Sequence, residues 1–214
     1  MMCFDKTGTL TEDGLDILGA RPVYIDKKKK FTFSKLQTDF STLAPEISTN
    51  TRQLENKRYD KMFNNTSTGL PSEQLFDALM CCHSLTKVNG NLIGDTLDIK
   101  MFNATGAILD ESESTDNGAH IIASITTPKF SNRTIGIVRK FEFASKLQRM
   151  SVVTKVIGDP IYRMFIKGSP EKIREMCNEK TIPGNFHKIL QKYTENGYRV
   201  LALGAKLLDI EYKQ

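Results

Sequence analysis

An aspartate near the start of the chain is followed by residue types that suit phosphoryl transfer. Asp5 ends a short apolar stretch, and a loop of lysine, threonine and glycine follows it. A carboxylate with an ordinary pKa of about 3.9 is anionic at neutral pH and can attack phosphorus without a base. The loop offers N–H groups, hydroxyls and one cation to the charge of a transferring phosphoryl group. We expect Asp5 to be a phosphorylated nucleophile in a catalytic loop formed with Lys6, Thr7, Gly8 and Thr9.

The residue two positions after Asp5 narrows the type of aspartyl-phosphate chemistry. Phosphatases with a similar loop usually carry a second aspartate there, which acts as a general acid and base. This chain has Thr7 instead. Without that group hydrolysis is slower, so the loop favours a phosphoenzyme that persists until another event triggers its breakdown. A soluble phosphohydrolase of the HAD-like type is therefore the less favoured alternative.

The complete string CFDKTGTLTE, residues 3–12, resembles the signature of the P-type ATPases. This resemblance implies an ATP-driven pump that is phosphorylated on Asp5. It also implies that Mg²⁺ binds at Asp5 and Thr7, with its remaining ligands outside this chain. Three further strings, CCHSLT, FASKLQRMSVV and KGSPE, are similar to the fifth subfamily, in the branch of endolysosomal and vacuolar polyamine or cation pumps.

Four downstream segments resemble, in the same order, the nucleotide-binding domain of that family. The resemblance implies that Asp98 approaches the adenine amino group and that Phe143 stacks on adenine. It places the lysine of a KGSPE loop deep in the ATP pocket and an arginine near the phosphates. The implied ATP-binding residues are Asp98, Phe143, Lys167, Gly168 and Arg199.

Two domains are expected to contribute to the chain. Residues 1–22 would hold the first strand and loop of an incomplete HAD-like phosphorylation domain, with a hinge strand over 15–24. Residues 23–214 would form the nucleotide-binding domain. A polar insertion over about 26–71, rich in lysine, serine, threonine and asparagine, contains a few apolar residues that could pack.

Helix and strand patterns in the second half of the chain predict an α+β fold. Ser72 is a candidate N-cap for a helix that begins near residue 71. Further helices are expected over 96–105, 170–177 and 185–196, with a polar loop over 110–118. Strands in hairpin succession predict a mainly antiparallel sheet flanked by helices. The expected strands cover 119–126, 134–143, 149–157, 161–167 and 199–208.

Composition limits the other classes of function. The net charge of +5 suits an anionic ligand such as ATP, and the Lys27–Lys30 cluster is a short run typical of a solvated loop. No nucleic-acid motif accompanies it, so we expect no nucleic-acid partner. No apolar run of about 18 residues is present, so we expect no membrane contact by this segment, which would be soluble on the cytosolic face of a membrane. Cys82 and His83 are expected on a buried helix face rather than in a metal site.

The sequence has no counterpart of the family's magnesium-binding GDGxND loop or of its TGE-type dephosphorylation loop. The expected partners are ATP and the remaining phosphorylation, actuator and transmembrane domains of the same pump. We expect this segment to bind ATP and not to form the Asp5 phosphoenzyme alone, with residues 1–14 loosely held. A free-standing ATP-binding module without catalysis is the main alternative.

Overall fold

The computed structural model describes residues 16–26, 28, 30–44, 71–128 and 131–208. The Asp5 loop and the expectations for residues 1–14 lie outside the described residues. The same holds for most of the predicted polar insertion, from residue 45 to residue 70.

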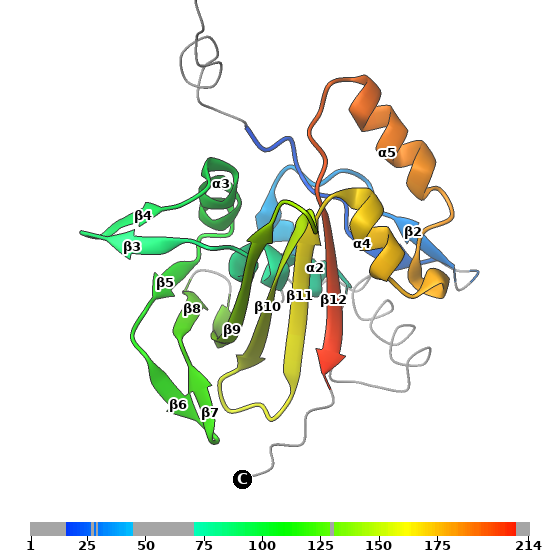
Figure 1. The fold of residues 1–214 in the computed structure, drawn as a ribbon. Helices are drawn as coiled ribbons and strands as arrows, with labels where there is room; N and C mark the ends of the chain where they lie inside the picture. Colours follow the sequence, from blue (N-terminus) through cyan, green and yellow to red (C-terminus); the bar gives the residue numbers. More distant parts are fainter. Residues whose placement is uncertain (1–15, 27, 29, 45–70, 129–130, 209–214) are drawn as a thin grey trace, which may run out of the picture.

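A six-stranded antiparallel sheet forms the centre of the described fold (Figure 1). Its order is β12-β11-β10-β9-β8-β5, and each neighbouring pair is antiparallel. This confirms the predicted α+β class. The strands are β5 (Ile108–Asp110), β8 (Ala123–Thr127), β9 (Ser131–Ala144), β10 (Arg149–Val156), β11 (Tyr162–Gly168) and β12 (Ala202–Leu208).

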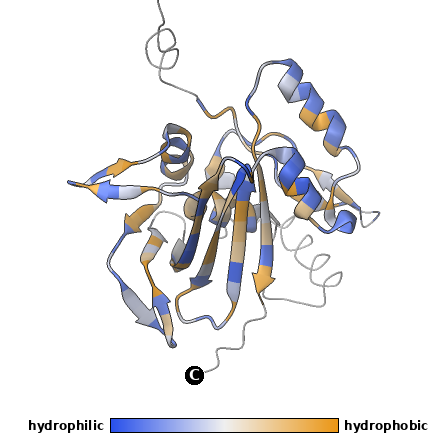
Figure 2. Cartoon of the chain, viewed as in Figure 1, coloured by the Kyte–Doolittle hydropathy of each residue, from blue (hydrophilic) through white to orange (hydrophobic). Residues whose placement is uncertain are grey.

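Helices lie on both faces of this sheet. The helices α2 (Pro71–Cys81) and α3 (Thr96–Ala104) bury apolar residues against the face that carries Ile137, Val152 and Phe165. On the opposite face, α4 (Pro170–Met176) packs over Gly204, where an added Cβ would lie 3.6 Å from a methyl group of Ile173. We call these the α2 face and the α4 face. Figure 2 shows hydrophobic and hydrophilic residues interspersed along the central strands, as expected when the two faces differ in burial.

Local capping explains where two of the helices begin. The Asp95 side chain accepts hydrogen bonds from the N–H groups of Leu97 and Asp98 at the start of α3. Ser169 caps α4 in the same way, with Pro170 in the first turn, as the sequence predicts. The prediction that Ser72 caps the first helix is wrong, because α2 already begins at Pro71 and Ser72 lies inside its first turn.

Three two-stranded hairpins surround the sheet. Two of them close on an Asn-Gly pair in which both residues have positive φ, the turn that suits a two-residue hairpin. The prediction of a polar loop over 110–118 is therefore wrong in part. A strand, β6, lies in this range, and its residues are polar because the strand is mostly exposed. The hairpins are β1 (Val23–Ile25) with β2 (Phe31–Phe33), β3 (Thr86–Val88) with β4 (Asn91–Ile93), and β6 (Ser114–Asp116) with β7 (Ala119–Ile121).

The predicted hinge strand over 15–24 is mostly absent from its described part. β1 begins only at Val23, and before it a single bridge joins Ala20 to Gln37. Gly19 explains this close crossing: a Cβ there would lie 2.4 Å from the Gln37 carbonyl oxygen. The predicted strand over 119–126 is divided into β7 and β8. The strand predicted from Arg199 starts at Ala202, since β11 ends at Gly168, opposite Ala202.

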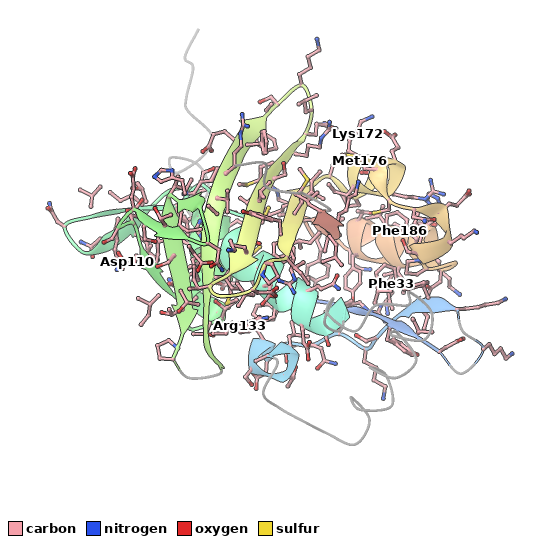
Figure 3. All side chains as sticks on the ribbon, turned by 90° about the horizontal axis from the view of Figure 1, so that it is seen from below. Phe33, Asp110, Arg133, Lys172, Met176 and Phe186 are labelled. Atoms are coloured by element: carbon pink, nitrogen blue, oxygen red, sulfur yellow. The ribbon has the colours of Figure 1, made fainter. Side chains whose placement is uncertain are left out.

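Part of the polar region packs, as expected. Phe31 and Phe40 are buried, the latter in the 3-10 helix η1 (Phe40–Leu43). Phe33 of β2 lies beside Phe186 of α5 (Phe186–Glu195), with ring centroids 6.4 Å apart (Figure 3). A second 3-10 helix, η2 (Glu179–Thr181), precedes α5. No helix in the described part of the chain is long and apolar enough to cross a membrane.

Candidate functional site

Strand register brings three of the predicted ATP-binding residues to one end of the sheet. Lys167 is paired with Met150, and Gly168 is paired with both Arg149 and Ala202. Arg149 is in turn paired with Ala144, the residue after Phe143. We call this the site end of the sheet. In Figure 1 it is the end at which β9 and β11 finish and β10 and β12 begin.

Lys167 and Asp98 form a buried ion pair at this end. The ammonium Nζ of Lys167 contacts the carboxylate Oδ1 of Asp98, with only 6% and 8% of the two residues exposed. Burial raises the pKa of Asp98 above its ordinary value, while the positive charge of Lys167 acts in the opposite direction. The ion pair thus links β11 to the first turn of α3.

A bulge in β9 decides the direction of Phe143. Phe141 is opposite Ser151 and Ala144 is opposite Arg149, so two residues, Glu142 and Phe143, face the single residue Met150. Met150 shares its face with Lys167, because the two are paired. The bulge therefore brings Phe143 to the α2 face, and its side chain remains 60% exposed.

Without the bulge, strand alternation would place Phe143 on the same face as Phe141. Phe141 lies on the α4 face, because it is paired with Ser151 rather than Met150. The guanidinium carbon of Arg139 lies 4.9 Å from the centroid of the Phe141 ring. The two phenylalanines of this segment thus have separate surroundings.

The other two predicted residues differ in how firmly they are held. At Gly168 a Cβ would lie 2.4 Å from the Gln148 carbonyl oxygen, so close strand packing requires glycine there. Arg199 lies in the segment before β12, and its side chain is exposed. The structure brings Asp98, Phe143, Lys167 and Gly168 to the site end. Arg199 lies three positions before Ala202, which is paired with Gly168 at that end.

Cys82 and His83 form a buried wall behind the ion pair. They are each 1% exposed, so the predicted burial is confirmed, but they follow the last residue of α2 rather than lying on the predicted helix face. Burial raises the pKa of the Cys82 thiol to about 12 and, together with nearby Lys140 and Lys167, lowers the pKa of His83 to about 3. The Nδ1 atom of His83 accepts a hydrogen bond from the N–H of Leu85 at 3.1 Å. Both side chains are therefore neutral at pH 7.

Two residues that the sequence did not single out also belong to this end. The Ser84 hydroxyl donates a hydrogen bond to Oε2 of Glu142, the neighbour of Phe143. Ser84 lies in the string CCHSLT, whose resemblance to the subfamily assigned it no role. Glu142 could have been noticed only through its place beside Phe143.

The arrangement has the features that an adenine nucleotide requires. An exposed aromatic ring can stack on a base, a buried carboxylate can accept from an amino group, and an ammonium can contact an anion. For a metal, no group of three or more histidine, cysteine, aspartate or glutamate side chains is found within residues 16–44, 71–128 and 131–208, as far as they are described. The predicted Mg²⁺ residues Asp5 and Thr7 lie outside them.

Comparison with known proteins gives one family. The family described as P-type ATPase, cytoplasmic domain N, matches residues 72–213. The vacuolar cation-transporting ATPase YPK9 of Saccharomyces cerevisiae is 39% identical, over 97% of this chain and 15% of its own length. The polyamine-transporting ATPase 13A3 of Mus musculus is 36% identical, over 98% and 16%. The polyamine-transporting ATPase 13A2 of Homo sapiens is 35% identical, over 97% and 16%.

These matches confirm the resemblance to the polyamine- and cation-transporting branch. The chain spans only 15% to 16% of the length of these relatives, so it corresponds to one part of each. The family match covers more than half of the chain, including every element from α2 to β12 apart from the first residue of α2. This chain belongs to the P-type ATPases, within whose cytoplasmic domain N residues 72–213 fall.

Proposed function

We propose that this chain is the ATP-binding and autophosphorylation segment of a membrane pump that couples ATP hydrolysis to the transport of cations or polyamines. The observation that carries the nucleotide part is the site end of the sheet, where the buried Asp98–Lys167 pair and the exposed Phe143 share one face. The family and the names of the relatives support the pump.

In this proposal each residue has a separate task in holding ATP. Phe143 offers its exposed ring to the adenine, and the Asp98 carboxylate accepts from the adenine amino group. Lys167 lines the deep part of the pocket beside Gly168, whose missing side chain allows the strands to approach. Arg199, exposed before β12, reaches the phosphates. Contacts between ions and hydrogen-bonding groups are stronger where water is excluded, which favours a buried lysine over a surface one.

The phosphorylation step is assigned to the loop at Asp5. The Asp5 carboxylate oxygen attacks the γ-phosphorus of ATP, the bond from that phosphorus to the bridging oxygen breaks, and ADP leaves. Lys6, Thr7, Gly8 and Thr9 would surround the transferred group. Bound Mg²⁺, held by Asp5, Thr7 and ligands from outside this chain, would neutralise negative charge during the transfer. The intact pump would place this segment on the cytosolic face of an endolysosomal or vacuolar membrane, in contact with its remaining phosphorylation, actuator and transmembrane domains.

ATP binding can be tested by isothermal titration of the 214-residue chain. Phe143→Ala should weaken ATP binding by about tenfold, because stacking of a base on an aromatic ring contributes about 1–3 kcal/mol. Phe141→Ala is the matched control: the same substitution two residues away, on the α4 face, should leave the affinity unchanged. Equal affinities for the wild type and Phe143→Ala would refute the site.

The phosphoenzyme can be tested separately in the intact pump. Radiolabelled ATP with Mg²⁺, followed by an acid quench, should give an acid-stable label that Asp5→Asn abolishes. The same assay on the 214-residue chain should give no label, because the ligands outside it are needed. Label that persists in Asp5→Asn would show that another residue is the nucleophile.

A further inference from the structure

The site end of the sheet has two walls that come from distant parts of the sequence. One wall is α3, which carries Asp98 in its first turn. The other is the end of β9, which carries Phe143 in the bulge. An adenine that meets both residues needs these walls at a fixed separation, and sheet pairing cannot fix it, because α3 is not part of the sheet.

The bulge is also the least regular part of the β9–β10 pairing near the site. Glu142 and Phe143 share one partner, so the pairing sets the face on which Phe143 lies but holds the two residues less firmly than a regular ladder does. A contact from outside the strand is needed to hold them.

Ser84 makes such a contact. It lies in the short segment between α2 and β3, directly after the buried Cys82 and His83 and before Leu85, which is 1% exposed. Its backbone is therefore anchored on both sides. Its hydroxyl donates to the carboxylate of Glu142 in the bulge. A backbone hydrogen bond from Ser84 also lowers the pKa of the Asp98 carboxyl in the other wall.

We propose that Ser84 is a positioning residue for nucleotide binding: through its hydrogen bond to Glu142 it fixes the bulge, and so sets Phe143 at the correct separation from Asp98. This inference rests on the proposed ATP site and adds to it a residue that does not touch the base. Ser84 and Glu142 are both exposed, so their hydrogen bond contributes little to the stability of the fold. If this hydrogen bond had no positioning role, its removal would leave ATP affinity unchanged.

Titration of ATP into variants of the 214-residue chain tests this role. Ser84→Ala and Glu142→Ala should each weaken ATP binding by about fivefold, the effect of one hydrogen bond. The double variant should be no weaker than either single one, since both remove the same contact. Ser84→Thr and Glu142→Gln keep a hydroxyl donor and an oxygen acceptor, so both should bind ATP nearly as the wild type does.

Urea denaturation of the same variants separates positioning from folding. The unfolding midpoints of Ser84→Ala and Glu142→Ala should match that of the wild type. Wild-type affinity in both variants, or effects that add in the double variant, would overturn the proposal. So would affinity losses matched by losses of stability.

A second pair of variants separates this proposal from the site itself. In a Phe143→Ala background, adding Ser84→Ala should cause no further loss of ATP affinity, because Ser84 acts through Phe143. If Phe143→Ala binds ATP normally, the proposed site fails, and the role of Ser84 fails with it. If Phe143→Ala is weakened and Ser84→Ala is not, the site stands and only the positioning role is refuted.

Discussion

The two ends of the six-stranded sheet each bury a lysine, and the surroundings of the two differ. Lys155, at the end remote from the site, is 1% exposed. Its ammonium lies 2.5 Å from the Asp116 carboxylate, 3.2 Å from the Asp116 carbonyl oxygen and 5.7 Å from the centroid of the Tyr162 ring. Lys167, at the site end, is held by the Asp98 carboxylate and lies on the same face as the exposed Phe143.

A second buried charge at the remote end also has several partners within the protein. The Asp77 carboxylate of α2 is bonded to Arg133, which lies on the α2 side of the sheet (Figure 3), and the positive charge of Arg163 also acts on it. The charges at the remote end have their partners within the protein. Within the described residues Lys167 contacts one carboxylate, that of Asp98, and it shares a face with the exposed Phe143, so it can still contact a ligand. Burial of a lysine alone therefore does not identify a site.

The largest expected effect concerns pH at the remote end. Burial raises the pKa of Asp77 from 3.8 to about 6, against the charges of Arg133 and Arg163 and with that of Glu73. The folded protein thus holds this proton more tightly than the unfolded chain does. The stabilisation is complete below the unfolded pKa and is lost as pH rises through about 6, a change of up to about 3 kcal/mol.

Urea denaturation of the wild type and Asp77→Asn at pH 4 and pH 7 measures this contribution. The difference between the two proteins isolates Asp77 from other titrating groups such as His83. From pH 4 to pH 7 the wild type should lose unfolding free energy relative to Asp77→Asn. A constant difference across this range would mean that Asp77 does not titrate there.

Exchange of each lysine for methionine tests the comparison directly. Lys167→Met should weaken ATP binding by about 10- to 100-fold, because a hydrogen bond to a charged group contributes about 1.5–3 kcal/mol. Lys155→Met should leave ATP affinity unchanged. It should lower the unfolding free energy, because it leaves the Asp116 carboxylate without this cation. Titration calorimetry and urea denaturation measure both quantities. Equal effects on ATP affinity would contradict the distinction between the two ends.

Gly168→Ala is expected to distort the site end. The new Cβ would lie 2.4 Å from the Gln148 carbonyl oxygen and 2.9 Å from Cβ of Arg149. Overpacking of this kind costs about 1–3 kcal/mol of unfolding free energy. Gly184→Ala is the control, since nothing lies within 4 Å of its added Cβ. Urea denaturation should show a loss for the first variant only.

The smallest effect is expected for an exposed ion pair near the site. Lys100 of α3 contacts Asp16, whose side chain is 93% exposed, and this contact lowers the pKa of the Asp16 carboxyl. Solvent screens such a pair, so Asp16→Asn should change neither the unfolding midpoint nor ATP affinity measurably. A clear loss of ATP affinity would extend the site to the segment before β1.

The local patterns of the sequence predicted most of the described sheet and helices. Ser169-Pro170 and the long alternating strands gave elements within a few residues of their observed bounds, because capping and alternation are local properties. The sequence did not indicate the β3–β4 hairpin or β6, because these strands are mostly exposed and have little apolar alternation. In place of the predicted hinge strand, the segment before β1 makes a single bridge from Ala20 to Gln37, a contact between residues that are distant in the sequence.

The sequence by itself determined the family, because CFDKTGTLTE and the four later segments are local strings in a fixed order. It also determined the α+β class and the residue types available for ATP. Only the tertiary structure decided that Lys167 is buried against Asp98. It also decided that Phe143 lies on the α2 face with Lys167, whereas Phe141 lies on the α4 face. Both depend on pairing between strands and on packing against α3, and neither can be read from residues that are neighbours in the chain.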